Sequence, residues 1–236
     1  MMVNPSLSLK PFAQWGIVLV FAGLCFWSGK WGLAAIYSYP AQMLVDYWSA
    51  QQKRGQPVNN ERWQSAYAAL RQAQALAPDD ADIRFLIGQM HHYQAIGQPA
   101  WSAIGKKHWQ QALEAYHTAV SLRPTWGYAW GLLAQAKLQS AAPIAQVTAD
   151  WQRAITCAPH SFDTYQISMQ IGFALWPLLS DQHRQQVKYA IAQLFARQGD
   201  HIIQLASKFH HLELLQPLLQ QNPQWQKQYD AALQAK

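Results

Sequence analysis

Three prolines that close similar six-residue patterns constrain this chain most. Pro78, Pro124 and Pro159 each follow an alanine by five positions, in the segments 73–78, 119–124 and 154–159. Proline cannot continue an α-helix, because its ring removes the backbone N–H and clashes with the preceding turn. The same helix ending therefore recurs along the chain, and such internal repetition is typical of stacked helical units.

The residues around each proline strengthen this interpretation. Small or apolar residues precede each proline at helical spacing: Ala66, Leu70 and Ala73; Ala112, Tyr116 and Ala119; Val147, Trp151 and Ala154. Residues that favour helix starts follow: Asp79-Asp80, Thr125 and His160-Ser161. Pro124 and Pro159 are 35 positions apart, but Pro78 and Pro124 are 46 apart. We assign the excess to a loop from Ile96 to Gly105.

This pattern resembles the tetratricopeptide repeat (TPR), a helix–turn–helix unit of about 34 residues. The resemblance covers residues 60–176 and rests on Trp130, Leu133, Ala134, Ala136, Trp151, Ala154 and Pro159, and on Ile87, Gly88, Ala112, Tyr116, Ala119 and Pro124. Arg84 departs from the family pattern, which has an aromatic residue there. The resemblance implies an all-α fold, with a TPR-like α-solenoid of stacked helical hairpins.

The resemblance also implies a binding surface. In TPR proteins, ligands lie in the concave groove formed by the first helix of each hairpin. Carried over by register, the groove residues here are Asp82, Phe85, Gln89 and His92, then Tyr128, Gln135 and Leu138, then Asp163, Gln166, Gln170 and Phe173. Because they include no Lys or Arg clamp for a terminal carboxylate, they suit a neutral polymer or an extended backbone. The alternative is a plain packing surface.

The N-terminal part of the chain is predicted to cross a membrane. After a short tail, residues 1–11, the segment 12–37 is overwhelmingly apolar and has Lys30 as its one charge. About 20 such residues span the hydrocarbon of a bilayer as a helix. Trp15, Trp27 and Trp31 are aromatics of the kind found at membrane interfaces. A cleaved signal peptide is the alternative, but bulky aromatics crowd the expected cleavage site.

The segment 38–58 is interpreted as a juxtamembrane helix and a linker. After Pro40, residues 41–52 place Met43, Leu44, Tyr47 and Trp48 on one side of a short helix, which either lies along the lipid headgroups or covers the first repeat. Residues 53–57 are the expected linker. The short tail favours a cytoplasmic N-terminus, so the domain is expected outside the bacterial inner membrane, in the periplasm.

Residues 177–236 lack the repeat pattern and are predicted to form capping helices, which cover an open apolar end. We expect one helix from Ser180 to about Arg197, another from Asp200 to about His210, and two short ones after it. Trp63, Trp109, Trp130 and Trp151 fall in the apolar register and are predicted to be core. Trp101, in the loop, and Trp225, after Asn222-Pro223, are candidate exposed aromatics.

Composition and spacing argue against several classes of function. The net charge is +6, but only Lys53-Arg54 and Lys106-Lys107 are basic pairs, whereas nucleic-acid binding needs a clustered basic stripe. The histidine pairs His91-His92 and His210-His211 point to different sides of a helix, which does not suit one metal ion. No nucleophile or phosphate-binding motif is present. We therefore expect no cofactor, no metal site and no catalytic residues.

The sequence thus predicts a membrane-anchored scaffold or assembly factor rather than an enzyme. In size and layout it resembles the small anchored repeat proteins that accompany bacterial exopolysaccharide synthesis and export, so glycan polymer and envelope proteins are candidate partners. A protein-binding subunit of another inner-membrane complex, for division, secretion or cytochrome maturation, is the second hypothesis. A helical-toroid carbohydrate-active enzyme is a third, and it requires paired carboxylates across a cleft.

Overall fold

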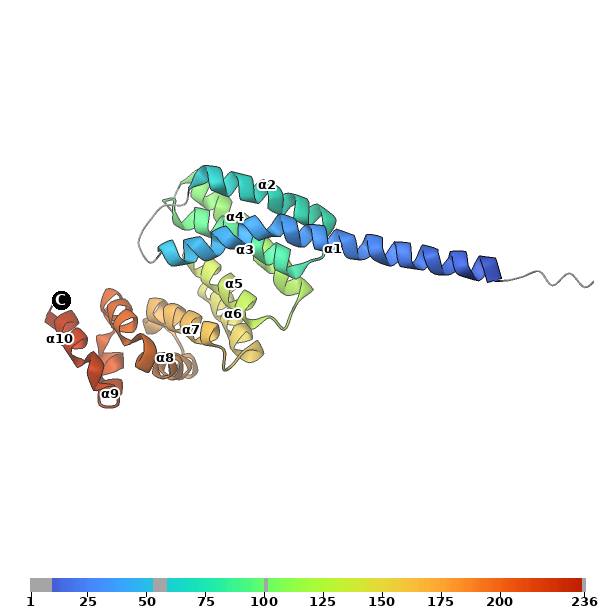
Figure 1. Ribbon diagram of the computed structural model, residues 1–236. Helices are drawn as coiled ribbons and strands as arrows, with labels where there is room; N and C mark the ends of the chain where they lie inside the picture. The colour runs from blue at the N-terminus through green and yellow to red at the C-terminus, as the bar shows by residue number, and fades with distance from the viewer. Residues whose placement is uncertain (1–9, 53–58, 100–101, 235–236) are drawn as a thin grey trace, which may run out of the picture.

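The computed structural model describes residues 10–52, 59–99 and 102–234, and within these ranges the chain is helical without strands. Figure 1 shows a helical domain from which one long helix projects. The larger elements are α1 (Lys10–Gln52), α2 (Asn60–Leu76), α3 (Ala81–Ile96), α4 (Ala103–Leu122), α5 (Gly127–Gln139), α6 (Ile144–Cys157), α7 (Phe162–Leu175) and α8 (Asp181–Lys208). Short elements complete the chain: η1 (Trp176–Leu178), η2 (Leu212–Leu215), α9 (Gln216–Leu219), η3 (Pro223–Trp225) and α10 (Gln226–Gln234). The predicted all-α class is confirmed for these ranges.

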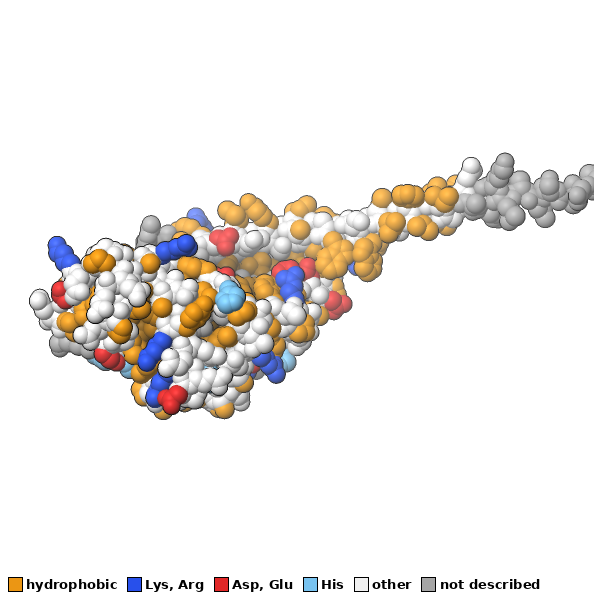
Figure 2. Space-filling view, turned by 90° about the horizontal axis from the view of Figure 1, so that it is seen from below, with side chains coloured by type: hydrophobic (Ala, Val, Ile, Leu, Met, Phe, Trp, Pro, Cys, Tyr) orange, Lys and Arg blue, Asp and Glu red, His pale blue; other side chains and the backbone are white. Residues whose placement is uncertain are grey.

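Helix α1 has two halves with opposite environments. Its side chains are exposed from Gln14 to Gly29 and almost continuously up to Leu33, and the first buried one is Ala34. The exposed stretch has a length of about 30 Å at 1.5 Å per residue, which matches the hydrocarbon core of a bilayer. By length and composition, the segment Gln14–Ala50 is able to cross a membrane. In Figure 2, hydrophobic side chains cover this projecting rod.

The second half of α1 belongs to the domain, which corrects the expected division of residues 12–58. The helix runs through Pro40 without interruption instead of ending there. Beyond it, Ala41, Val45 and Trp48 are buried against α2 and α3. This burial at helical spacing offsets the hydrogen bond that Pro40 cannot donate. The segment therefore covers the first hairpin and is no separate helix. The expected linker and the residues 1–9 of the tail lie outside the described residues.

The three repeated prolines lie just after three helix ends of nearly identical geometry. Ala77, Arg123 and Ala158 cap the C-termini of α2, α4 and α6, with φ between −143° and −132° and ψ between 65° and 80°. Each cap N–H donates to the carbonyl four residues earlier, at 2.9–3.0 Å, and this carbonyl belongs to the alanine that recurs in the repeated pattern: Ala73, Ala119 or Ala154. The predicted helix ends at these prolines are thus confirmed.

The predicted helix starts are only partly right. Asp80 caps α3, and its carboxylate accepts from two backbone N–H groups at 2.8 and 3.1 Å. Ser161 occupies the cap position of α7 as expected, although its side chain makes no capping bond. Trp126, not Thr125, precedes α5. Its ring is held over the Arg123 guanidinium, 4.6 Å from the centroid, and this contact anchors the turn without a capping side chain.

Consecutive helices pack in pairs. The most extensive contacts join α1 with α2, α3 with α4, α5 with α6, and α7 with α8. A side chain at Gly88 on α3 would lie 2.5 Å from the Tyr116 ring on α4, and one at Gly172 on α7 would lie 2.4 Å from Val187 on α8. These glycines are required because the two helices of each pair approach too closely for a Cβ atom.

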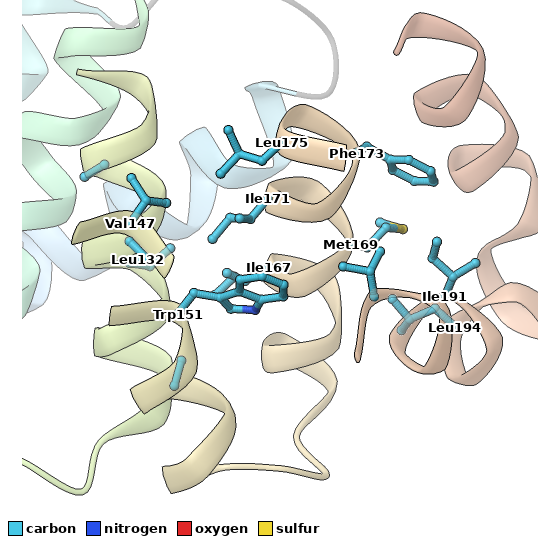
Figure 3. Close-up of a cluster of buried hydrophobic side chains, with 14 of the residues drawn as sticks. Leu132, Val147, Trp151, Ile167, Met169, Ile171, Phe173, Leu175, Ile191 and Leu194 are labelled. Atoms are coloured by element: carbon cyan, nitrogen blue, oxygen red, sulfur yellow. The ribbon is translucent and has the colours of Figure 1, made fainter. Parts of the chain in front are cut away.

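The buried side chains form two clusters. The N-terminal cluster joins α1, α2 and α3 and consists of Ala34, Ala41, Val45, Trp48, Trp63, Ala66, Leu70, Ala73, Ala77, Ile83, Leu86, Ile87 and Met90, with Ala115 of α4. The larger C-terminal cluster runs from Phe85 through α4–α8 to Tyr229. In Figure 3, Ile167, Ile171 and Leu175 of α7 point toward α5 and α6, while Met169 and Phe173 point toward Ile191 and Leu194. Helix α7 is therefore buried on two sides.

The C-terminal region agrees with expectation around Gly199. The segment labelled α8 consists of two helices that meet at a kink, where Gln198 has non-helical backbone angles (φ −130°, ψ 25°). Gly199 is buried, and a Cβ atom there would lie 2.4 Å from the Trp225 indole nitrogen. The segment around Trp225 therefore packs against α8 at this kink. The short helices that follow agree with the sequence prediction.

Candidate functional site

The side chains implied as groove residues are only partly gathered by the fold. Gln89, His92, Tyr128 and Gln135 line one pocket of about 90 Å³ between α3, α4 and α5. The rest of its wall comes from Tyr93, Ile96, Tyr116, Leu132 and Gln139. This pocket is lined mainly by polar groups and by phenol rings, so it presents hydrogen-bonding atoms to any occupant.

Glutamine side chains continue the pocket across the next helices. The Gln135 amide nitrogen donates to the Gln170 side-chain oxygen, which joins α5 to α7. The Gln166 amide nitrogen donates to the Gln198 oxygen at 3.2 Å, which joins α7 to α8. We call Gln89, Gln135, Gln166, Gln170 and Gln198 the amide row. Because each primary amide has two donor hydrogens and two acceptor lone pairs, these pairs retain groups that can bind a ligand amide or hydroxyl.

Two of the implied groove residues are buried instead. Phe85 is 6% exposed and packs against the rings of Trp126, Tyr116 and Tyr128, with centroid distances of 4.5, 5.5 and 5.5 Å. Phe173, also carried over from the family register, is buried between α7 and α8. The prediction that these rings form a ligand surface is therefore wrong. Both fall in the apolar register that packs neighbouring helices.

His92 is a neutral buried group at the floor of the pocket. Its Nδ1 atom lies 3.2 Å from the Tyr116 hydroxyl. Burial lowers the pKa of His92 to about 4 and raises the pKa of Tyr116 well above its usual value. Both groups therefore stay uncharged at neutral pH, and together they offer a hydrogen-bonding pair without a net charge.

The two aspartates of the implied groove have different roles. The Asp82 carboxylate accepts two hydrogen bonds from the Arg123 guanidinium at 3.0 and 3.1 Å, so it ties the start of α3 to the end of α4. This pair is exposed, and it does not line the pocket. Asp163 is exposed at the start of α7. It lies close enough to Tyr128 to help raise that phenol's pKa, which burial chiefly raises to about 12.

Helix α1 contributes to this surface, and sequence reasoning missed that. The carboxylate of Asp46 adds to the effect of burial in raising the pKa of Tyr93, and it also acts on Tyr128. Trp48 of α1 packs against Tyr93 with ring centroids 6.2 Å apart. The contribution was missed because the sequence left open whether residues 41–52 lie along the lipid headgroups or cover the first repeat, and no role in the groove was considered for them. The spacing of Ala41, Val45 and Trp48 was the available pattern that predicts packing on a domain instead.

The candidate aromatics divide as follows. Trp101 lies outside the described residues. Trp225 is half-buried against α8 and its indole nitrogen is buried without a hydrogen-bond partner, so the prediction of an exposed aromatic is wrong for this residue. Trp63, Trp109, Trp130 and Trp151 are all buried, as predicted. Three of these indoles donate internally at 2.8 Å, to Met90, Pro124 and Ser168.

A pair of histidines comes together elsewhere, on α3 and α4. The Nδ1 atoms of His91 and His108 are 2.9 Å apart, and both rings lie against Trp63. Burial, followed by the charge on His108, lowers the pKa of His91 to about 4. In the part of the chain that the structure describes, no third His, Cys, Asp or Glu joins this pair into a potential metal-binding group.

The geometry thus presents a polar, nearly uncharged surface built by α1, α3, α5 and α7, with amide groups as its main hydrogen-bonding chemistry. On the face of the domain seen in Figure 2, Lys, Arg, Asp and Glu side chains are scattered in small groups among hydrophobic and uncharged ones. In comparisons with known proteins, no protein-family model matches the chain and no curated protein is significantly similar to it.

Proposed function

We propose that this chain is a membrane-anchored, TPR-like scaffold whose amide row binds an extended segment of a partner in a bacterial envelope complex. One observation carries the proposal. A single helix, α1, first exposes a span of apolar side chains and then enters the core of the domain at Ala34, Ala41, Val45 and Trp48. A span fused to the core in this way suits a protein that holds partners at the membrane surface.

The repeated architecture supports the TPR-like part of the proposal. Three helices end with the same cap geometry just before Pro78, Pro124 and Pro159. Helices pack in consecutive pairs, and among the first helices of these pairs α1 contacts α3 and α5 contacts α7, while α5 meets the second pair mainly through α4. Stacked pairs of this kind place one row of helices along one surface, where an extended ligand meets several units in turn.

The chemistry of the amide row favours an extended polypeptide over a charged ligand. Glutamine amides complement backbone N–H and C=O groups, which an extended chain offers at regular spacing. Asp46 and Asp163 are the nearby charges, so a neutral or mildly basic segment fits best. Exopolysaccharide synthesis or export remains our first candidate for the complex, with the domain in the periplasm.

Site-specific photo-crosslinking in cells tests the binding face. A crosslinker at Gln135 is expected to yield an adduct with a membrane-complex protein, and one at Glu114, exposed on α4, is not. Replacing Gln89, Tyr128 and Gln166 together by Ala is expected to abolish the Gln135 adduct while the protein stays folded. Equal adducts at both positions, or an adduct that survives the triple replacement, would contradict the proposal.

Membrane attachment and topology need a separate test. Phe21→Arg with Leu24→Arg places two charges in the exposed half of α1, where each is costly in hydrocarbon. The variant is expected to leave the membrane fraction, whereas Gln204→Arg with Gln193→Arg on the domain surface is not. A C-terminal reporter that is active only outside the cytoplasm is expected to give activity. Activity only from a reporter that works in the cytoplasm would show that the orientation is the reverse of the one proposed.

A further inference from the structure

A second pocket lies on the opposite side of α7 from the amide row. Its volume is about 270 Å³, and it is enclosed by Ile155 of α6, by the turn at Pro159 and by residues of α7 and α8. On α7 its lining residues are Thr164, Tyr165 and Ser168, whereas the amide row uses Gln166 and Gln170. At 3.6 residues per turn, these two sets project from opposite faces of the helix.

Two residues that line this pocket each carry a buried side-chain oxygen with no hydrogen-bond partner within the described residues. These are the Thr164 hydroxyl, in a residue only 2% exposed, and the Gln186 side-chain oxygen. The Gln186 amide nitrogen is already used, because it donates to the Gln152 oxygen at 3.3 Å. Leaving a buried polar group unpaired costs about 1–3 kcal/mol. An occupant toward which these two side chains turn would remove that cost.

The remaining lining defines the chemistry of that occupant. No charged side chain lines the pocket, so a charged ligand would be desolvated without compensation. The rings of Tyr165 and Tyr189 meet edge to face with centroids 5.8 Å apart, and Ile155, Pro159 and Ala190 supply apolar surface. These walls suit the edge or face of another ring.

We propose that the pocket between α6, α7 and α8 binds a small uncharged aromatic molecule that carries one O–H or N–H group. The donor hydrogen of the ligand bonds to the Gln186 oxygen. In a phenol, the ligand oxygen also accepts from the Thr164 hydroxyl. The aromatic body lies between the two tyrosines and the apolar wall. The volume suits one ring or a fused pair of rings, below the range of drug-sized sites.

The test uses the full chain in lipid nanodiscs and p-cresol as the probe. The Trp151 indole donates to Ser168, a lining residue, at 2.8 Å, so its N–H resonance reports on the pocket. Titration with p-cresol is expected to shift that resonance saturably. Toluene has the same shape without the hydroxyl and is expected to bind about tenfold more weakly, since a hydrogen bond to a buried acceptor is lost.

Three variants make the result decisive. Thr164→Val keeps the volume and removes the hydroxyl, so it is expected to weaken p-cresol about tenfold and leave toluene unchanged. Thr156→Val, exposed on α6, is the matched control and is expected to bind both probes as the wild type does. Ala190→Phe fills the pocket and is expected to abolish binding. Its melting temperature checks that it is folded.

Three outcomes would overturn the proposal. The first is a Trp151 resonance that does not shift saturably with p-cresol. The second is equal affinity for p-cresol and toluene, which would leave the two polar atoms to bind water only. The third is unchanged p-cresol affinity in Thr164→Val. Because the readout is local and needs no partner protein, these results do not depend on the function of the amide row.

Discussion

The two buried clusters are built by different means. The N-terminal cluster needs the second half of α1 as a wall. Beside it, Trp63 stacks on Tyr67 at 4.7 Å and meets the rings of His91 and His108 at 5.4 and 5.5 Å. The C-terminal cluster is larger, needs no part of α1 and mixes aliphatic side chains with buried rings such as Trp109, Tyr116 and Trp151. Beside it lies a pocket of about 270 Å³.

This difference predicts which kind of change destabilises each cluster. The N-terminal cluster depends on α1, whose exposed half is long and apolar enough to cross a membrane, and on the neutral His91 ring beside Trp63. The C-terminal cluster packs on two sides of α7 (Figure 3), and a pocket of about 270 Å³ lies beside it. We therefore expect the first region to respond to truncation and to pH, and the second to respond to ligands.

Truncation is expected to give the largest effect. A chain that begins at Asn59 loses the buried contacts of Ala34, Ala41, Val45 and Trp48, which should destabilise the N-terminal cluster by about 5 kcal/mol or more. A chain that begins at Gly32 keeps these contacts and is the control. Circular dichroism during urea unfolding measures the difference. Equal midpoints for the two chains would show that α1 is not part of the core.

Removing one α1 ring is expected to have the next largest effect. Trp48 is 4% exposed and its neighbour Tyr47 is 48% exposed. Trp48→Ala should cost about 3–5 kcal/mol of unfolding free energy, because it leaves a cavity in the N-terminal cluster. Tyr47→Ala, at the exposed neighbouring position of the same turn, should cost less than about 1 kcal/mol. Urea unfolding of both variants checks this, and similar losses would contradict the assigned packing.

Acidification should act first on α3, where His91 packs against Trp63 of the N-terminal cluster and His92 packs against Trp109 and Tyr116 at the edge of the C-terminal cluster. In the folded chain the pKa values of His91 and His92 are about 4, below the usual 6.5. Between these values only the unfolded chain takes up the protons, so stability is full above pH 6.5 and falls as the pH decreases toward 4. At about pH 5.5 the loss is about 1 kcal/mol for each histidine.

Hydrogen exchange of backbone amides measures this response. Protection of α3 is expected to fall more than protection of α7 when the pH is lowered from about 7.5 to about 5.5, after correction for intrinsic exchange. In the His92→Phe variant, the pH-dependent loss of protection in α3 should be smaller by the amount that His92 contributes. A parallel loss in both helices would mean that the clusters unfold as one unit, and the distinction drawn between them would not hold.

The smallest expected effect lies in the C-terminal cluster. Thr164→Val removes a buried hydroxyl without a hydrogen-bond partner, so it should stabilise the unliganded protein by up to about 1 kcal/mol. Thr156→Val, whose native hydroxyl bonds to the Gln152 carbonyl at 2.9 Å on the exposed side of α6, should be neutral or slightly destabilising. Thermal unfolding distinguishes them. Destabilisation by Thr164→Val would indicate a hydrogen-bond partner for that hydroxyl.

Local rules predicted the parts of the fold that local chemistry controls. A helix does not readily continue through Pro78, Pro124 or Pro159, because proline lacks the backbone N–H that the next helical hydrogen bond requires. These helix ends were therefore predictable. The buried tryptophans followed from apolar periodicity. Pro40 did not obey the same rule, because packing of Val45 and Trp48 on α2 and α3 outweighs its local cost. That packing is a tertiary property and is invisible in a window of sequence.

The candidate site shows the same limit. Gln89, His92, Tyr128 and Gln135 were assigned to one surface by register and line the same pocket, and their role in binding stays a prediction. Phe85 was assigned to the same surface, yet it is buried against Tyr116 of α4 and does not line the pocket. The pocket beside Thr164 requires three helices at particular distances, which no spacing of residues specifies. The sequence therefore predicted the residues of the polar surface better than it predicted the pocket beside Thr164.

The uninterrupted α1 has a mechanical consequence. A domain tethered by a flexible chain tumbles freely, but a domain whose first helix is also its membrane span inherits the tilt and rotation of that span. With the anchoring proposed above, a partner held in the same bilayer would meet the amide row at a preset height and orientation. Part of the rotational entropy that association normally costs would then be lost before the encounter. Because α10 lies at the end of the domain away from the projecting half of α1 (Figure 1), a tilt of that helix would displace α10 more than α2.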